Sequence, residues 1–352
     1  MQTESVSANT RLQAPAPTRY RGAIWTLLVL APVISEVLSG STRLSILFVL
    51  IPEVMVWGGG ALLCRELVRR WRASATSLLL LGLALSVAEE FIIQQTSIAP
   101  LPFPGANPNF GRYAGVNWIY FLFMLGFESV WVVLIPVQVT ELIFPDRRGQ
   151  PWLRKRGLIA TCVAFLIGSR IAWYGWTQQA RPRLRAAPYH PPPALILLGL
   201  AAIAALIGTA WLMRDYGHSG QIDSRQPVNP WIVGIKAFVF AAAWFELIGL
   251  VFVPHPGLAA WIPLTASSIW AFLAFAIVRY WSAAKGWRDI HLFALSFGAV
   301  LGCMLMCDIS AAGWTRVDLI GKLVFQSLGV AGFLLLWRKV WQREAADRAP
   351  GC

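Results

Sequence analysis

The chain has 352 residues, of which 57% are hydrophobic and only 13% are charged, and its formal net charge is +13. About a quarter of the residues in a soluble globular domain are charged, so this composition excludes that class. Long apolar runs between short polar breaks are instead typical of a polytopic helical membrane protein. The basic residues lie at the ends of the apolar runs and not on one polar face, which argues against a nucleic-acid partner.

The chain begins with a polar segment, residues 1–22, which we expect to be a disordered tail. Ten apolar stretches follow, and each is close to the roughly 20 residues that a membrane-spanning helix needs. The sequence therefore predicts an all-α bundle of about ten transmembrane helices, over residues 23–40, 45–65, 76–95, 117–144, 157–177, 194–213, 231–253, 258–280, 288–309 and 318–337.

The spans fall into two groups separated by a basic loop. We divide the chain into the N-terminal tail, a four-helix acidic half, the loop, a six-helix half and a basic C-terminal tail, over residues 1–22, 23–145, 146–156, 157–337 and 338–352. The longest connection within the acidic half, residues 96–116, is rich in proline and glycine. We expect it to be an irregular loop.

The distribution of lysine and arginine predicts the orientation of the bundle, because cytoplasmic loops carry an excess of both. With the N-terminus in the cytoplasm, 21 of the 30 basic residues fall on the cytoplasmic side and 6 on the opposite side. The sequence therefore predicts that both termini are cytoplasmic.

Acidic residues inside the spans are the feature that points to function. An acidic side chain at the middle of a bilayer costs about 2.5–3.5 kcal/mol, so it normally faces protein or a water-filled cavity. Five of the six interior glutamates fall in the first four spans, and the sixth is Glu246. On an α-helix Gln94 shares a face with Glu90. The candidate proton- or substrate-binding residues are Glu36, Glu53, Glu89, Glu90, Gln94 and Glu128.

Two interpretations of these glutamates remain open. If they converge, burial and mutual repulsion prevent all of them from being ionised, and neutral acids can carry protons. Pro32, Pro52 and the run Gly58–Gly60 favour bent helices around such a site. Alternatively, each glutamate pairs with a cation such as Arg170 or Lys236, or caps a broken helix, and has only a structural role.

Motifs of other chemistries are absent from the sequence. It has no Walker loop, no dinucleotide-binding glycine motif and no His-Glu-x-x-His, and we expect no metal and no cofactor. The basic stretch Arg147–Arg156 favours contact with anionic headgroups. The expected partners are therefore membrane lipids and a small-molecule or ion substrate.

The segment Glu89-Glu90-Phe-Ile-Ile-Gln94 resembles the first motif of the CPBP family of intramembrane endopeptidases, in which arginine occupies the last position. The resemblance implies a hydrolase whose glutamates activate water with the help of histidines on later helices. The catalytic candidates would then be Glu89, Glu90 and Glu128. The later histidine motifs are missing from the sequence, whose four histidines are His190, His218, His255 and His291.

A broader resemblance, over about residues 24–160, is to uncharacterised bacterial multi-spanning membrane proteins. It is carried by Ser35-Glu36, by Gly58-Gly59-Gly60 with Arg65-Glu66, by Ala88-Glu89-Glu90, and by Thr140-Glu141 with Pro145. The resemblance implies a shared fold and a place in a bacterial cytoplasmic (inner) membrane. It implies nothing about catalysis.

Three functions are therefore open. The first is proton-linked transport of a small solute through a buried carboxylate cluster. The alternatives are a non-catalytic scaffold or lipid-interacting protein and a CPBP-like hydrolase with degenerate motifs. The first two are favoured over the hydrolase, so we favour a protein that is not an enzyme. The sequence does not determine the substrate, the direction of transport or the oligomeric state.

Overall fold

Ten helical segments long and apolar enough to cross a membrane make up most of the structure, a computed structural model. It describes residues 18–102, 107, 109–187, 189–216, 224–252, 257–309 and 314–347. The segments coincide with the ten predicted spans to within a few residues, except that the second, the fifth and the last extend further at their C-terminal ends. The predicted all-α membrane bundle is confirmed, while much of the predicted N-terminal tail lies outside the described residues.

The first four spans are each built from several helical pieces. The first consists of α1 (Thr18–Pro32) and η1 (Val33–Val37), and the second of η2 (Leu44–Val49), α2 (Leu50–Glu53), η3 (Val54–Gly58) and α3 (Gly59–Trp71). The third consists of α4 (Ala75–Ala88) and η4 (Glu89–Ile93), and the fourth of α5 (Trp118–Phe127), η5 (Glu128–Leu134) and α6 (Ile135–Ile143).

The other spans are more regular. The fifth contains α7 (Lys155–Trp173), η7 (Tyr174–Ala180) and the short α8 (Arg181–Arg183), and it follows the single turn η6 (Pro145–Arg147). Each remaining span is one helix, in the order α9 (Pro193–Leu212), α10 (Pro230–Phe252), α11 (Trp261–Ser282), α12 (Asp289–Ile309) and α13 (Arg316–Ala346).

The breaks in the first four spans are π-helical turns, in η1, η3, η4 and η5. The prolines expected to bend the helices lie beside three of them. Pro32 directly precedes η1, Pro52 lies two residues before η3, and Pro136 follows η5. Proline removes an amide donor and clashes with the preceding turn, so a local change of helix type absorbs the mismatch.

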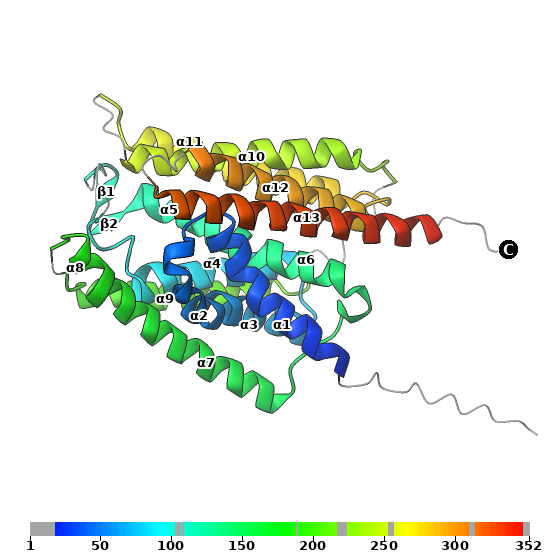
Figure 1. Ribbon diagram of the computed structural model, residues 1–352, viewed down its shortest axis with the longest axis horizontal. Coiled ribbons are helices and arrows are strands. Elements are labelled where there is room, and N and C mark those ends of the chain that lie inside the picture. Colours follow the sequence, from blue (N-terminus) through cyan, green and yellow to red (C-terminus); the bar gives the residue numbers. More distant parts are fainter. Residues whose placement is uncertain are drawn as a thin grey trace, which may run out of the picture.

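The fourth span lies between the two largest hydrophobic cores. Figure 1 shows α10 to α13 on one side of the bundle and α1 to α4, α7 and α9 on the other, with α5 and α6 between them. Val132 and Val133 pack into the core formed by α1, α3 and α4. Trp131 and Ile135 pack into the core shared with α10, α12 and α13. One broken span therefore joins the two halves of the molecule.

Helix α1 begins and α13 ends at the same end of the bundle (Figure 1), as an even number of crossings requires. The opposite end carries a short antiparallel hairpin within the loop that was predicted to be irregular. Strand β1 (Arg112–Tyr113) pairs with β2 (Val116–Asn117). The two turn residues, Ala114 and Gly115, both have positive φ, as the tight turns of hairpins require.

Close packing of α10 on α12 gives a test of the fold. A Cβ atom at Gly298 of α12 would lie 2.1 Å from the backbone oxygen of Gly234 on α10. We expect Gly298→Ala to push the two helices apart and to lower the free energy of unfolding by about 1–3 kcal/mol. Thermal unfolding of the purified protein in detergent measures this effect.

The matched control is Gly249→Ala on α10, where a Cβ atom would meet nothing within 4 Å. It should leave the melting temperature unchanged or raise it slightly, because alanine favours helix more than glycine does. Equal melting temperatures for the two variants would contradict the close approach of α10 and α12.

Candidate functional site

Five glutamates from the first four spans come together inside the bundle, and we call them the acidic cluster: Glu36, Glu53, Glu89, Glu90 and Glu128. Glu36 lies close enough to Glu53 and to Glu89 for their charges to interact. Glu128 in turn interacts with Glu36, Glu89 and Glu90. The carboxyl groups therefore share one region, although they are far apart in the sequence.

Every member of the acidic cluster lies in or next to a π-helical turn. Glu36 is in η1, and Glu53 is the residue before η3. Glu89 and Glu90 open η4, and Glu128 opens η5. Such turns occur frequently at functional sites, because the extra residue changes the direction of side chains and loosens the backbone bonds. The helix breaks and the acidic side chains therefore coincide in space.

The acidic cluster is buried and only partly hydrogen-bonded. Glu53, Glu89, Glu90 and Glu128 are each at most 3% exposed, and Glu36 is half-buried. Both oxygens of Glu89 and one oxygen each of Glu53 and Glu128 have no hydrogen-bond partner. Within the described part of the chain no cation forms an ion pair with any of the five.

Hydroxyl groups supply the donors that the acidic cluster does have. Thr96 and Ser97 donate to the two carboxylate oxygens of Glu90, at 3.1 and 2.5 Å, and Thr42 donates to Glu53. Sequence reasoning missed these three residues. The signal available was only that Thr96 and Ser97 follow Glu90 within seven residues, directly after the span ends.

A further buried donor lies beside the acidic cluster without a partner. The hydroxyl of Ser86, one turn before Glu89 and Glu90, lies next to Glu128 but makes no hydrogen bond of normal geometry. Tyr120, near the start of α5, also interacts with Glu90 and Glu128. Buried polar atoms are normally paired with protein or with ordered water, so donors and acceptors without a protein partner at one place make it the candidate functional site.

The loop after η4 closes the end of the bundle above the acidic cluster. The amide of Asn117 donates to the carbonyl of Ser97 at 2.8 Å. The guanidinium of Arg112 donates to the carbonyls of Ile98, Ala99 and Gly115. The hairpin therefore holds in place the segment whose hydroxyls contact Glu90.

Gln94 forms no hydrogen bond with the acidic cluster in the described residues. Its side chain is half-buried, and the residue directly follows η4, the turn that contains Glu89 and Glu90. Gln94 therefore stays a predicted member of the site, without a contact that links it to the five glutamates.

The cations proposed as structural partners lie elsewhere. Arg170 stacks on the ring of Trp173 at 4.3 Å, and Lys236 lies 5.6 Å from the ring of Trp281. Lys322 on α13 pairs with Asp308 at 2.9 Å and donates to the carbonyl of Cys307 at 2.7 Å. The part of the structural interpretation in which each glutamate has its own cation therefore finds no support in the described residues.

Neither of the two histidines that the structure describes lies at the acidic cluster. His291 lies near the start of α12, stacked on Trp287, and His190 is exposed before α9. His218 and His255 lie outside the described residues. In the residues that the structure describes, no three His, Cys, Asp or Glu side chains are arranged to hold a metal ion.

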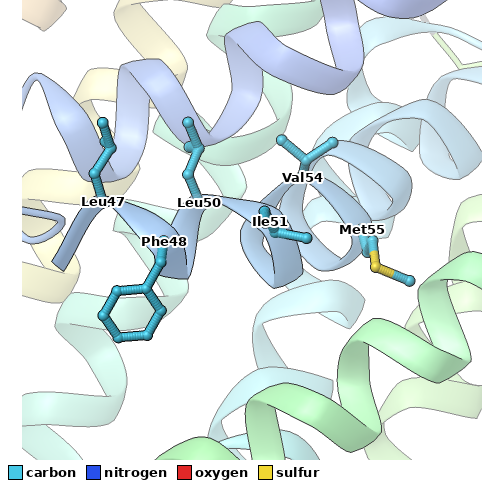
Figure 2. Close-up of a pocket in the computed structure, with 6 residues that line it drawn as sticks. All are labelled: Leu47, Phe48, Leu50, Ile51, Val54 and Met55. Carbon is cyan, nitrogen blue, oxygen red and sulfur yellow. The ribbon is translucent and has the colours of Figure 1, made fainter.

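The second span also carries an apolar depression on its outer surface. Figure 2 shows Leu47, Phe48, Leu50, Ile51, Val54 and Met55 around this depression, which has a volume of about 570 Å³. Phe48 and Ile51 are 71% and 70% exposed. Since Glu53 is buried, the second span presents an apolar face outward and its carboxyl group inward.

The other end of the bundle holds a second charged group, in which the partners are complete. We call it the arginine clamp: Arg65, Glu66 and Glu141 with the loop of residues 147–153. The fully buried Arg65 donates to Glu141 at 3.0 Å and to the carbonyls of three loop residues, Arg147, Arg148 and Gln150. Its guanidinium also stacks on Trp152, 3.3 Å from the ring centroid.

Glu66 completes the clamp by accepting hydrogen bonds from the backbone amides of Trp152 at 2.6 Å and Leu153 at 3.2 Å. The same loop reaches α12 through Arg148, which donates to both oxygens of Asp289 at 2.8 and 2.9 Å. Burial opposes the charge of Arg148, but these hydrogen bonds and the charge of Asp289 outweigh it and raise the pKa of Arg148.

A family model described as an uncharacterized membrane protein family matches residues 26–280, more than half of the chain. The chain belongs to this family. The match covers the acidic cluster and the whole arginine clamp, and it confirms the resemblance to uncharacterised multi-spanning proteins. The search of curated proteins and the search of solved structures returned no match.

The contrast between the two charged groups predicts opposite effects of the same substitution. Glu66→Gln should destabilise the protein by about 3–5 kcal/mol, because it leaves the buried Arg65 without its full set of acceptors. Glu89→Gln removes a buried carboxyl group whose oxygens have no partners, so the melting temperature should stay the same or rise. Thermal unfolding of both variants in one detergent tests this, and equal destabilisation would contradict it.

Proposed function

We propose that this membrane protein moves protons together with a small solute, and that the acidic cluster binds the protons. The observation that carries the proposal is the convergence of five carboxyl groups at the breaks of four spans, with four buried oxygens lacking any donor. A structural role would require partners for these oxygens. A role in proton exchange requires oxygens that are free to accept a proton.

The electrostatics of the acidic cluster support protons as the ligand. Several carboxylates without cations cannot all remain charged in a buried site, because desolvation and mutual repulsion oppose ionisation. Glu89, with no partner on either oxygen, lies next to Glu90, with both oxygens bonded. A proton therefore meets carboxyl groups of different basicity within one site, which suits its transfer between them.

The shape of the first four spans supports a change of access. Broken helices around a buried site are common in transporters, where parts of the bundle rock about the binding site. Here the arginine clamp holds one end of the second and fourth spans, and the hairpin closes the other end of the third and fourth. The π-helical turns between them are the points at which the spans can bend.

A hydrolase is less well supported, since in the described residues no histidine lies at the acidic cluster and the family match is not to the CPBP endopeptidases. A purely structural role remains as an outcome of the experiment.

Proton flux through the purified protein tests the proposal. The protein is reconstituted in liposomes that contain a pH-sensitive dye, and a potassium diffusion potential drives protons inward. We expect wild-type protein to acidify the lumen and Glu90→Gln or Glu128→Gln to reduce the rate at least tenfold, because a glutamine cannot take up and release a proton. Candidate solutes added on either side then test for coupling.

The matched control is Glu246→Gln, which changes an exposed glutamate of α10 outside the acidic cluster. It should leave the flux unchanged. A wild-type flux that survives Glu90→Gln and Glu128→Gln would overturn the proposal, and the absence of any wild-type flux, with or without solutes, would favour the structural role.

We further propose a bacterial inner membrane as the location, with both termini in the cytoplasm. The excess of basic residues at the end of the bundle where α1 begins and α13 ends supports this orientation (Figure 1). Alkaline phosphatase inserted between Ala114 and Gly115 should be active, and green fluorescent protein fused after Asp347 should fluoresce. The reverse pattern would contradict the orientation.

A further inference from the structure

An apolar groove separates α13 from the first, second and fourth spans, and no member of the acidic cluster lines it. Its volume is about 430 Å³, which lies within the range of about 300–1,000 Å³ typical of small-molecule sites. The lining consists of aliphatic side chains, two phenylalanines and two glycines, and it includes Val33 and Val37 of η1, Ile143 of α6, and Gly332 and Leu336 of α13.

We propose that this groove binds one acyl chain of an anionic phospholipid, whose phosphate lies against the basic residues at the end of α13. This inference is independent of the proposed transport, because it uses neither the acidic cluster nor its protonation.

The dimensions of the groove fit an acyl chain. On α13 its lining runs from Phe325 to Leu336, about 16 Å at 1.5 Å per residue. This is about half of the roughly 30 Å hydrocarbon core of a bilayer, which is the depth of one leaflet. The lining contains no charged side chain, so nothing in it would bind a polar solute.

Glycine opens the groove. A Cβ atom at Gly332 would meet nothing within 4 Å, whereas one at Gly329 would lie 2.8 Å from the side chain of Leu38. The space at Gly332 is therefore free, while Gly329 allows α13 to approach the end of the first span. A larger side chain at position 332 can occupy the groove without disturbing the packing around it.

Positive charge gathers at one end of the groove. Lys339 and Arg343 follow Leu336 by three and seven residues, so they continue the same face of α13. Arg343 donates to the carbonyl of Leu142 at 2.8 Å, and Leu142 is the neighbour of the groove residue Ile143. Arg338 and Lys339 are exposed and form no ion pair with any described residue.

Glu344, the sequence neighbour of Arg343, has partners at the start of α12. Glu344 turns away to accept from the amide of Ile290 at 2.9 Å and to pair with Arg288 at 3.5 Å. The exposed rings of Trp337 and Trp341 lie at the same level of α13. Tryptophan is enriched at the membrane–water interface, so these rings place the basic residues at the level of the lipid phosphates. Apolar lining and basic end together match an anionic phospholipid.

Lipid binding to the delipidated full-length protein tests the proposal. Phosphatidylglycerol and phosphatidylcholine with identical acyl chains are added in turn, and binding is followed by native mass spectrometry and by the melting temperature. We expect phosphatidylglycerol to bind at least tenfold more tightly and to raise the melting temperature more. Gly332→Leu should abolish the binding of phosphatidylglycerol, because the leucine side chain fills the groove. The double variant Lys339→Gln with Arg343→Gln should remove the preference for phosphatidylglycerol over phosphatidylcholine.

The matched control is Gly208→Leu on α9, another exposed glycine whose Cβ atom would meet nothing within 4 Å. It should bind phosphatidylglycerol as the wild-type protein does. Undiminished binding by Gly332→Leu, or equal binding of the two lipids by the wild-type protein, would overturn the proposal. A wild-type dimer that Gly332→Leu converts to a monomer would also overturn it, because a second copy would then occupy the groove.

Discussion

Burial of a charge in a membrane protein is tolerated only when the surrounding structure compensates for the lost water, and Arg65 shows what full compensation requires. Its guanidinium has two carboxylates, three backbone carbonyls and an aromatic ring as partners. Those partners come from α3, α6 and the loop before α7, so satisfying one side chain positions three segments. Removing one partner would leave a buried charge without compensation, which is why such pairs are costly to break.

The acidic cluster is buried like Arg65 but lacks partners of opposite charge. Its carboxyl groups lie close to one another, and the described part of the chain supplies three hydroxyl donors and no cation. Like charges in one buried site oppose one another's ionisation, so proton binding would stabilise the acidic cluster as the proposed function requires. The acidic half thus contains one charged group with complete partners and one without a cation in the described residues.

The π-helical turns connect these ends to the packing of the whole bundle. The break at η5 lies in the span whose side chains pack into both large cores. A bend there would therefore change the packing against α4 on one side and against α10 and α12 on the other. The backbones of α10 and α12 approach each other closely at Gly234 and Gly298, so these two helices form one tightly packed layer beside the fourth span.

The amino-acid sequence by itself determined the membrane class, the ten spans and the glutamates as the unusual residues, because hydrophobic length and intramembrane charge are local properties that need no partner to be recognised. The sequence could not show that Glu36, Glu53 and Glu128 meet Glu89 and Glu90. Those outcomes depend on how four helices pack and on where the π-helical turns change the phase of each helix. The hydroxyls of Thr42, Thr96 and Ser97 and the partners of Arg65 were likewise decided only by the tertiary structure, since a hydrogen bond between distant segments leaves no pattern in either one.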